Sequence, residues 1–281
     1  MAYDDIEDSV DNGEPLFFYE FIYDVAPGAA YRYVADTQRR VMSGKVWQPF
    51  AIKHDEITVS GSLDKQTLTV TARNDIAITA LYIAGSPSRE VQVNIWRGHA
   101  DTTDIVMEWT GRLLNCAWKG PDIEMSCESL STALTAIGLR RKYQRGCPHT
   151  LYGKACRASR LAHTENGTVT TVNNKLDVNV TLSGAETGFT ASNLIGGVFR
   201  ATVDSGITEI RAITGATLIG GRQWRLSLMS QIPEVRTGLA VSVSKGCPHT
   251  FDACRDTFQN AANYGGCANI PEKNPFTNNQ F

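Results

Sequence analysis

The pentapeptide Gly-Cys-Pro-His-Thr stands at residues 146–150 and returns unchanged at residues 246–250. A second cysteine follows each copy, after eight intervening residues in the first case and six in the second. The proline fixes the backbone directly after the leading cysteine, and the glycine before it permits close approach of another segment. The repeat therefore predicts two short loops that each present two thiols. The four cysteines are Cys147, Cys156, Cys247 and Cys254.

The chain between the two copies is long enough to form a small β domain. Short runs typical of strands lie there, separated by turn signals such as Asn173-Asn174, Gly196-Gly197 and Gly220-Gly221. The ends of a domain usually lie close together, so it can be inserted into another at little cost. We therefore expect the two cysteine loops to meet where the inserted domain begins and ends. The six predicted strands are Thr168–Val172, Lys175–Leu182, Val198–Val203, Ile207–Ile213, Trp224–Leu228 and Leu239–Val243.

Strand patterns also dominate the chain before the first loop. The aromatic run Leu16–Tyr23 is apolar on both faces, and the later runs alternate with period two. Helix signals are confined to Ile76–Ile83, with Asn74 or Asp75 as its cap, and to Ser129–Ile137. This spacing indicates an antiparallel sandwich or barrel. The other predicted strands are Ile57–Ser60, Leu68–Thr71, Val91–Trp96, Ile105–Trp109 and one on each side of Lys119–Asp122.

The predicted fold is mainly β, with few short helices. The first residues are acidic and rich in turn formers, and the last are rich in Asn and Pro, so neither end is expected to pack as a regular element. The predicted divisions are a mobile arm (1–15), a β-sandwich or barrel domain (16–145), a cysteine-bearing region (146–160 and 246–270), an inserted β domain (161–245) and an extended C-terminal tail (271–281).

Composition excludes several classes of protein. The chain has 281 residues, of which 42% are hydrophobic and 20% charged, with a net charge of −2. A charge so close to zero argues against general nucleic-acid binding. No apolar run approaches the ~18–20 residues that span a bilayer, so we expect no stable membrane anchoring. The acidic start lacks the features of a secretory signal, and we expect folding in a reducing cytosol.

Seven cysteines in such a compartment indicate metal binding or catalysis more than a disulfide framework. Four converging thiolates suit zinc or an iron–sulfur cluster. Structural zinc sites usually have gaps of roughly two to four residues, so the wider gaps here favour a cluster, with zinc and two disulfides as alternatives. His149 and His249 are weaker candidate ligands, and Cys267 is a further candidate. We expect Cys116 and Cys127 in the core.

Motifs of common enzymes are missing from the sequence. It holds no Ser-His-Asp set, phosphate-binding loop, Gly-rich dinucleotide turn or paired-histidine zinc helix. The isolated His54, His99 and His163 are expected on the surface or in turns. The sequence therefore argues against an enzyme.

Several stretches carry a family resemblance that covers roughly residues 16–272. They are Gly138–Gly153, Val93–His99, Cys247–Phe258 and Asn263–Gly266 with Ile270-Pro271 beyond it. These residues resemble the tail-tip or baseplate hub proteins of long, flexible-tailed phages (siphophages) and gene transfer agents. The cysteine spacing is also similar to that of minor tail protein L of lambda-like phages. Relatives usually continue Gly-Gly-Phe where this chain has Gly265-Gly266-Cys267, which leaves Cys267 as a substitute ligand or disulfide partner.

The resemblance implies a structural virion protein and not an enzyme. Such a hub joins the distal tail ring to the central fibre or receptor-binding assembly. Its N-terminal domain would form a ring as a homotrimer, and its partners would be the distal tail protein, the central tail fibre protein and the tape measure protein. It would be assembled into the phage tail tip in the host cytoplasm.

The resemblance also implies an iron–sulfur cluster of the 4Fe-4S type, with Cys147, Cys156, Cys247 and Cys254 as ligands. Such a cluster would tie residues near 150 to residues near 250 as a structural staple. Two other functions remain open at this stage: a soluble zinc-binding interaction module, and an iron–sulfur enzyme. The enzyme is disfavoured because the sequence shows no polar set for a substrate pocket.

Overall fold

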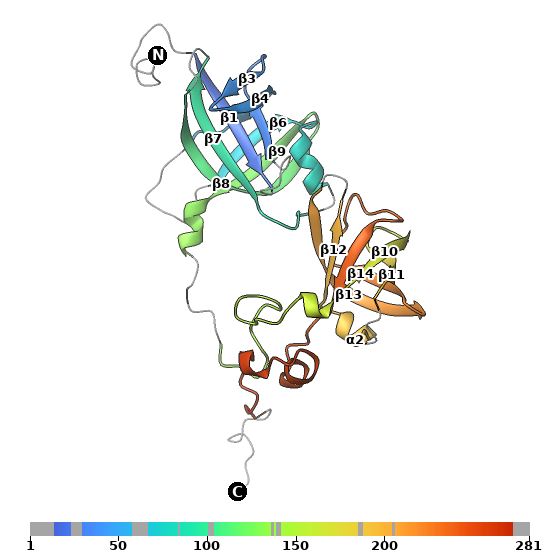
Figure 1. The fold of residues 1–281 in the computed structure, drawn as a ribbon. Coiled ribbons are helices and arrows are strands. Elements are labelled where there is room, and N and C mark those ends of the chain that lie inside the picture. Colours follow the sequence, from blue (N-terminus) through green and yellow to red (C-terminus); the bar gives the residue numbers. More distant parts are fainter. Residues whose placement is uncertain are drawn as a thin grey trace. The chain divides into compact units, whose positions relative to one another are not determined.

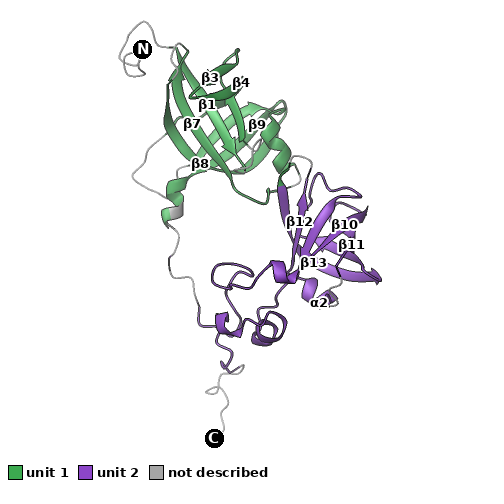
Figure 2. Ribbon diagram, viewed as in Figure 1, with its two compact units in different colours: residues 1–137, 205–207 green, residues 138–204, 208–281 purple. Residues whose placement is uncertain are grey.

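The computed structural model describes residues 14–23, 30–57, 67–83, 85–100, 104–135, 138, 142–184, 188–203 and 206–271. Strands dominate these residues and the helices are short, so the predicted mainly β class is confirmed. The chain divides into two compact units, residues 1–137 with 205–207 and residues 138–204 with 208–281 (Figure 2). Among the described residues, no helix is long and apolar enough to cross a membrane.

The first unit is built on one nine-stranded sheet with the strand order β3-β4-β2-β1-β7-β8-β9-β6-β5. Nearly all neighbouring strands are antiparallel, and the exception is the parallel pair of β2 and β4. The strands are β1 (Pro15–Ile22), β2 (Ala30–Val34), β3 (Arg40–Met42), β4 (Lys45–Pro49), β5 (Ile52–His54), β6 (Thr67–Arg73), β7 (Val91–His99), β8 (Ile105–Lys119) and β9 (Asp122–Ser129).

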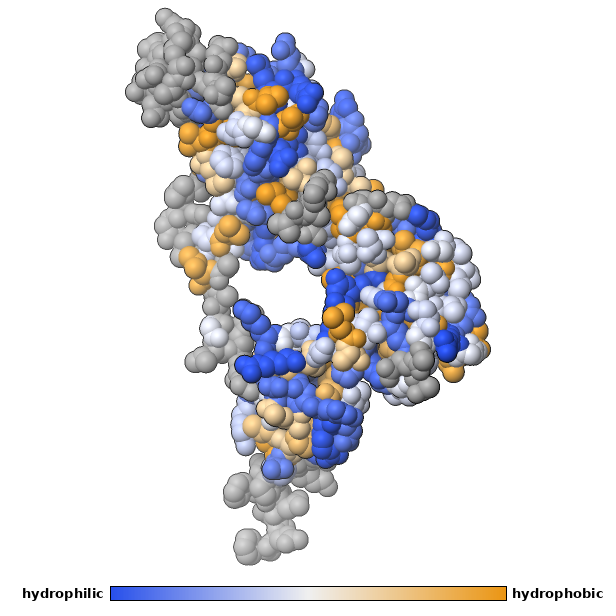
Figure 3. All heavy atoms as spheres, in the orientation of Figure 1, coloured by the Kyte–Doolittle hydropathy of each residue, from blue (hydrophilic) through white to orange (hydrophobic). Residues whose placement is uncertain are grey.

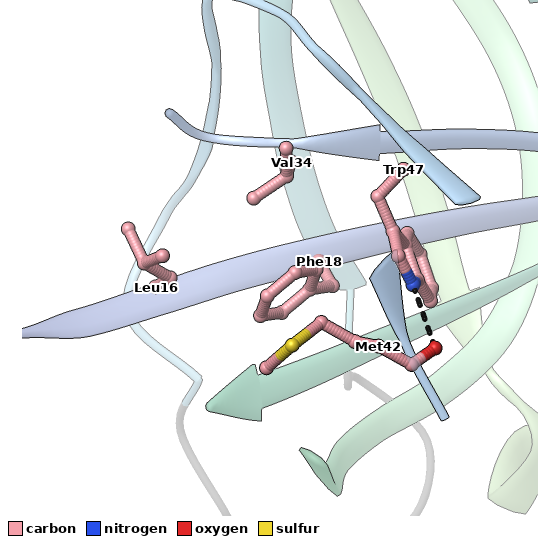
Figure 4. Packing of buried hydrophobic residues seen from close by; sticks show 5 residues of the cluster. All are labelled: Leu16, Phe18, Val34, Met42 and Trp47. Carbon is pink, nitrogen blue, oxygen red and sulfur yellow. Dashed lines mark hydrogen bonds between the residues drawn. The ribbon is translucent and has the colours of Figure 1, made fainter. Parts of the chain in front are cut away.

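The aromatic run forms β1, in the interior of this sheet. Phe18 packs edge-on against Trp47 of β4, with the two ring centroids 5.2 Å apart. Both side chains are fully buried. Leu16, Val34 and Met42 complete this cluster, and the Trp47 indole donates to the Met42 carbonyl at 3.3 Å (Figure 4). A strand that is apolar on both faces is therefore covered on both faces.

The sheet curls strongly (Figure 1). Four strands of the sheet lie between β1, which carries Tyr19, and β5, which carries His54. The Tyr19 hydroxyl and His54 Nδ1 are nevertheless hydrogen-bonded at 2.7 Å. His54 is half-buried, and His99 at the end of β7 is buried. The prediction of a surface or turn position is therefore wrong for His99, because β7 extends past the predicted strand end.

The two predicted helices are present as 3-10 helices, η2 (Ala77–Tyr82) and η3 (Leu130–Thr135). The predicted caps of η2 are wrong, because Ile76 is the N-cap residue and makes no side-chain cap. The Asn74 side chain instead donates to the Gly120 carbonyl, and Asp75 pairs with Arg73.

The sequence patterns missed four strands, β2 to β5, and one further predicted strand, Ile57–Ser60, falls largely outside the described residues. Ile57 lies outside any strand, and residues 58–60 of the predicted strand lie outside the described residues. The predicted arm is outside them up to residue 13, and the predicted tail from residue 272. In the view of Figure 3, hydrophobic and hydrophilic residues are interspersed on the surface of both units.

The second unit contains a closed six-stranded barrel with the order β10-β11-β14-β13-β12-β15. All six strands predicted between the cysteine loops are present, and the inward side chains that alternate along them form its core. A short helix, α2 (Ala191–Leu194), begins with a capping box made by Thr190 and Asn193. The strands are β10 (Thr164–Val172), β11 (Asp177–Leu182), β12 (Val198–Thr202), β13 (Thr208–Gly220), β14 (Gln223–Leu228) and β15 (Ala240–Ser244).

The barrel begins and ends at the same place. Thr164, the first residue of β10, pairs with Ser244, the last residue of β15, and their hydroxyls are 2.6 Å apart. Just outside the barrel, the Lys245 N–H donates to the carbonyl of His163 at 3.0 Å, in the 3-10 helix η4 (Leu161–His163). This pairing delivers the two cysteine loops to one end of the barrel.

Candidate metal centre

The first cysteine loop reverses direction through a tight turn. The Gly153 N–H donates to the Thr150 carbonyl at 3.0 Å, and the Arg157 N–H donates to the Gly153 carbonyl at 2.9 Å. Tyr152 lies inside this turn with φ at 61°, and its hydroxyl donates to the Lys245 carbonyl at 2.7 Å. The turn therefore folds the loop back on itself and ties it to the end of β15.

The glycines that open the two repeats differ in their surroundings. A Cβ on Gly246 would lie 2.6 Å from the carbonyl carbon of Gly196 and closer still to the Ile195 carbonyl oxygen. A Cβ on Gly146 would meet only the His249 carbonyl oxygen, at 3.8 Å, which is ordinary contact. Position 246 therefore has room only for glycine, because the backbone of residues 195–197 lies against it. Position 146 has room for a side chain.

The second loop continues into a short π-helical segment, η5 (Ala253–Thr257), that carries Cys254. The Cys254 N–H donates to the Thr250 carbonyl at 3.1 Å, and its side chain is buried. Its sulfur lies 3.2 Å from the Asn260 carbonyl oxygen, to which it donates. Single π-helical turns recur at functional sites in proteins.

The two loops bind each other through a reciprocal pair of hydrogen bonds. The Cys147 N–H donates to the His249 carbonyl at 2.8 Å, and His249 Nδ1 lies 3.0 Å from the Cys147 carbonyl oxygen. In Figure 1 the yellow-green first loop lies beside the red C-terminal segments. The structure thus brings together four sulfurs from positions a hundred residues apart. One cavity is lined by Cys147, Cys156, Cys247 and Cys254.

A third segment, residues 260–267, completes the cavity, and we call it the closing segment. Its first residue, Asn260, lines the cavity together with the cysteines. The Asn260 side-chain amide donates to the Cys156 carbonyl at 2.5 Å and lies 3.8 Å from the Cys156 sulfur. One side chain therefore connects this segment to the second cysteine of the first loop.

The closing segment also contacts the leading cysteine of the first loop. The carbonyl oxygen of Asn263 lies 3.1 Å from His149 Nδ1, and the Gly265 N–H donates to the Cys147 sulfur at 3.4 Å. The sequence patterns missed this role, because the contacts join residues more than a hundred positions apart. The only signal was that residues 263–266 belong to the family resemblance.

Backbone N–H groups point at two of the four sulfurs. Besides the bond from Gly265 to Cys147, the His249 N–H donates to the Cys247 sulfur at 3.3 Å. A hydrogen bond to sulfur favours the thiolate, which is the form that binds metals. The leading cysteine of each repeat therefore has a donor that supports metal ligation.

The neighbouring cysteines also affect the pKa values of Cys247 and Cys254. Burial raises the pKa of Cys247, and the nearby Cys156 and Cys147 add to the shift, while the His249 N–H opposes it. Burial also raises the pKa of Cys254, and the other three cysteines add to that shift. Negative charges in one cavity repel one another, which disfavours ionisation of all four thiols. A bound cationic group would stabilise the four thiolates.

All seven cysteines are free thiols in the structure. Within the described part of the chain, no three His, Cys, Asp or Glu side chains are grouped closely enough to surround a single metal ion. The side chain of Cys267 does not belong to the described lining of the four-cysteine cavity, and its N–H donates to the Gln144 carbonyl at 2.9 Å. The roles of all five cysteines as ligands or disulfide partners therefore stay predictions.

The two remaining cysteines lie in the first unit. Cys127 of β9 is fully buried, as expected for a core residue. Cys116 of β8 is only half-buried, and burial raises its pKa to about 12. Neither thiol takes part in the four-cysteine cavity.

Comparisons with known proteins connect this structure to phages. Residues 195–274 match the model of a family described as phage conserved hypothetical protein BR0599, and this stretch includes β12 to β15, the second cysteine loop and the closing segment. No curated protein matches the sequence. The structure is similar to a chain of the solved structure "Virion of native gene transfer agent (GTA) particle", with a TM-score of 0.81 and 15% identity over 97% of this chain and 93% of that chain. The two chains share a fold along nearly their whole length.

Proposed function

We propose that this protein is a structural component of a phage-type virion, located at the tail tip. The observation that carries this proposal is the shared fold, over 97% of the chain, with a protein of a gene transfer agent virion particle. The match of residues 195–274 to a phage family supports it independently. The family resemblance in the sequence narrows the role to a tail-tip hub, which is not an enzyme.

In this role the protein joins the distal tail ring to the central fibre or receptor-binding assembly. The first unit forms the ring as a homotrimer, and the second unit carries the cysteine loops. The distal tail protein, the central tail fibre protein and the tape measure protein are the proposed neighbours. Support for this arrangement comes from the resemblance to tail-tip hub proteins.

We also propose that Cys147, Cys156, Cys247 and Cys254 hold an iron–sulfur cluster. The donor set fits, because four thiols line one cavity and two of them receive backbone N–H bonds. Thiolate-only ligand sets are those of iron–sulfur clusters and of structural zinc. When bound, the cluster supplies metal–sulfur bonds that join the two loops.

The proposed cluster stabilises the fold, and this role needs no redox work. The loops that carry its ligands are already brought together by the pairing of β10 with β15 and by the Cys147–His249 bonds. A group that binds only the folded arrangement stabilises that arrangement directly. The cluster therefore acts as a staple between the two ends of the inserted barrel.

Anaerobic purification with iron, sulfide and zinc measured per chain tests the cluster. We expect about four iron and four sulfide atoms per chain in the wild type. Cys147→Ser and Cys254→Ser should lose them, while Cys116→Ser in the first unit should keep them. Zinc without sulfide would favour the zinc-binding interaction module, and the absence of both metals would refute a metal centre.

Immunogold labelling of purified particles tests the place of the protein. We expect the label at the distal end of the tail, and the protein should sediment with particles in a lysate. A protein that stays in the soluble fraction and is missing from purified particles would refute the virion role.

A further inference from the structure

The closing segment approaches the first cysteine loop more closely than any side chain would allow. A Cβ on Gly265 would lie 2.5 Å from the ring of His149. A Cβ on Gly266 would lie 2.7 Å from the Gly146 carbonyl oxygen and closer still to that of Arg145. The obstacle at Gly266 is backbone, which cannot rotate away as a side chain can. Glycine is therefore required at position 266, whereas a side chain at position 265 would force the His149 ring to move.

Further contacts of Tyr264 and Cys267 hold the closing segment in place. The Tyr264 hydroxyl donates to the Arg145 carbonyl at 2.5 Å, and its ring packs edge-on against Phe251 of the second loop at 5.3 Å between centroids. The Cys267 N–H donates to the Gln144 carbonyl at 2.9 Å. The segment is thus fastened to both cysteine loops.

The side chain of Tyr264 and the backbone of Cys267 make these contacts, and the segment forms a wall of the cavity. Asn260 and Asn263 line the cavity, and Gly265 directs its N–H at the Cys147 sulfur. We infer that the closing segment controls how fast the group bound by the four cysteines is released, with Gly266 and Tyr264 as its positioning residues. This inference rests on the proposed iron–sulfur function.

The physical reason is that local opening governs access to a partly enclosed site. A chelator or oxygen can reach the bound group when a wall moves aside, and the frequency of that opening depends on the contacts that hold the wall. Removing the Tyr264 hydroxyl deletes its hydrogen bonds to the Arg145 and His249 carbonyls and keeps the ring packing against Phe251. Adding a methyl at Gly266 displaces the backbone itself. Both substitutions should therefore speed the release of the bound group, and the substitution at Gly266 should have the larger effect.

The test follows iron release from anaerobically purified protein into excess chelator, through loss of visible absorbance. Tyr264→Phe should release iron about fivefold faster than the wild type, the factor that loss of the hydrogen bonding of one hydroxyl gives. Gly266→Ala should release it about tenfold faster or more. Gly220→Ala is the matched control, because a Cβ there meets nothing within 4 Å, and its rate should equal that of the wild type.

The readouts separate the possible failures. Iron content before chelation and the circular dichroism spectrum should match the wild type in Tyr264→Phe, so a faster release cannot be assigned to misfolding. Equal release rates in the wild type and Tyr264→Phe would overturn the inference, even if Gly266→Ala does not fold. A wild type without iron and sulfide would refute the proposed cluster, and this inference with it. A wild type that holds the cluster but whose variants release it at the same rate would refute this inference alone.

Discussion

At the scale of single residues, Glu20 is a buried carboxylate in the first unit. It lies in the middle of the apolar strand β1, and its side chain is only 2% exposed. Lys45 Nζ and Arg32 Nε both approach its carboxylate at 2.8 Å. Burial by itself would raise the pKa of Glu20, but hydrogen bonds from Lys45 and Arg32 outweigh it and lower the pKa below the ordinary 4.5. The charge is thus buried but compensated.

Glu20→Gln should destabilise the first unit by about 1–3 kcal/mol at neutral pH, because it leaves two cations facing a neutral amide. A group with a lowered pKa contributes stability that is present above its unfolded value and lost as pH falls through the folded value. The difference between wild type and variant should therefore shrink as pH falls below 4.5. Urea unfolding at a series of pH values measures this.

Glu90→Gln is the control for that measurement. Glu90 also pairs with an arginine, Arg112, at 2.6 Å, but its side chain is 73% exposed. Exposed ion pairs contribute little, so the change should cost less than about 0.5 kcal/mol. A Glu20→Gln variant as stable as this control would contradict the compensation described for Glu20.

At the scale of elements, the two copies of the repeat make a matched pair. Gly246→Ala should destabilise the second unit by about 1–3 kcal/mol, because the new methyl collides with the backbone of Ile195 and Gly196. Gly146→Ala should change stability by less than about 1 kcal/mol, since its methyl meets only ordinary contact. Thermal unfolding of both variants measures this. Equal losses of stability in the two variants would contradict the difference in surroundings described for the two glycines.

The same scale shows what a sequence can predict here. The six barrel strands could be predicted because apolar and polar residues alternate along each for five residues or more. The apolar ones point into the barrel core. Strands β3 and β5 have three residues each, too few to show a period. The role of the closing segment was missed because its structure depends on contacts with residues far away in the sequence. The residues around Asn260 have no local pattern from which these contacts could be predicted.

At the scale of the second unit as a whole, the candidate metal centre is a consequence of topology. In this closed barrel the first strand along the chain, β10, pairs with the last, β15. The chain therefore leaves and returns at one point, which is why two loops so far apart in sequence face each other. The repeat predicted this meeting correctly, although the identity of the bound group stays a proposal.

The last prediction concerns the whole molecule and removal of the metal. Because each unit has its own buried core, loss of the proposed cluster should affect only the segments that bind it. Hydrogen exchange followed by mass spectrometry should show lost protection in residues 146–160 and 246–267 after anaerobic chelation. Strands β1 to β9 should exchange as before. Equal exchange of the cysteine loops with and without metal would mean that the hydrogen bonds between them hold the structure alone, and the staple would have no role in stability.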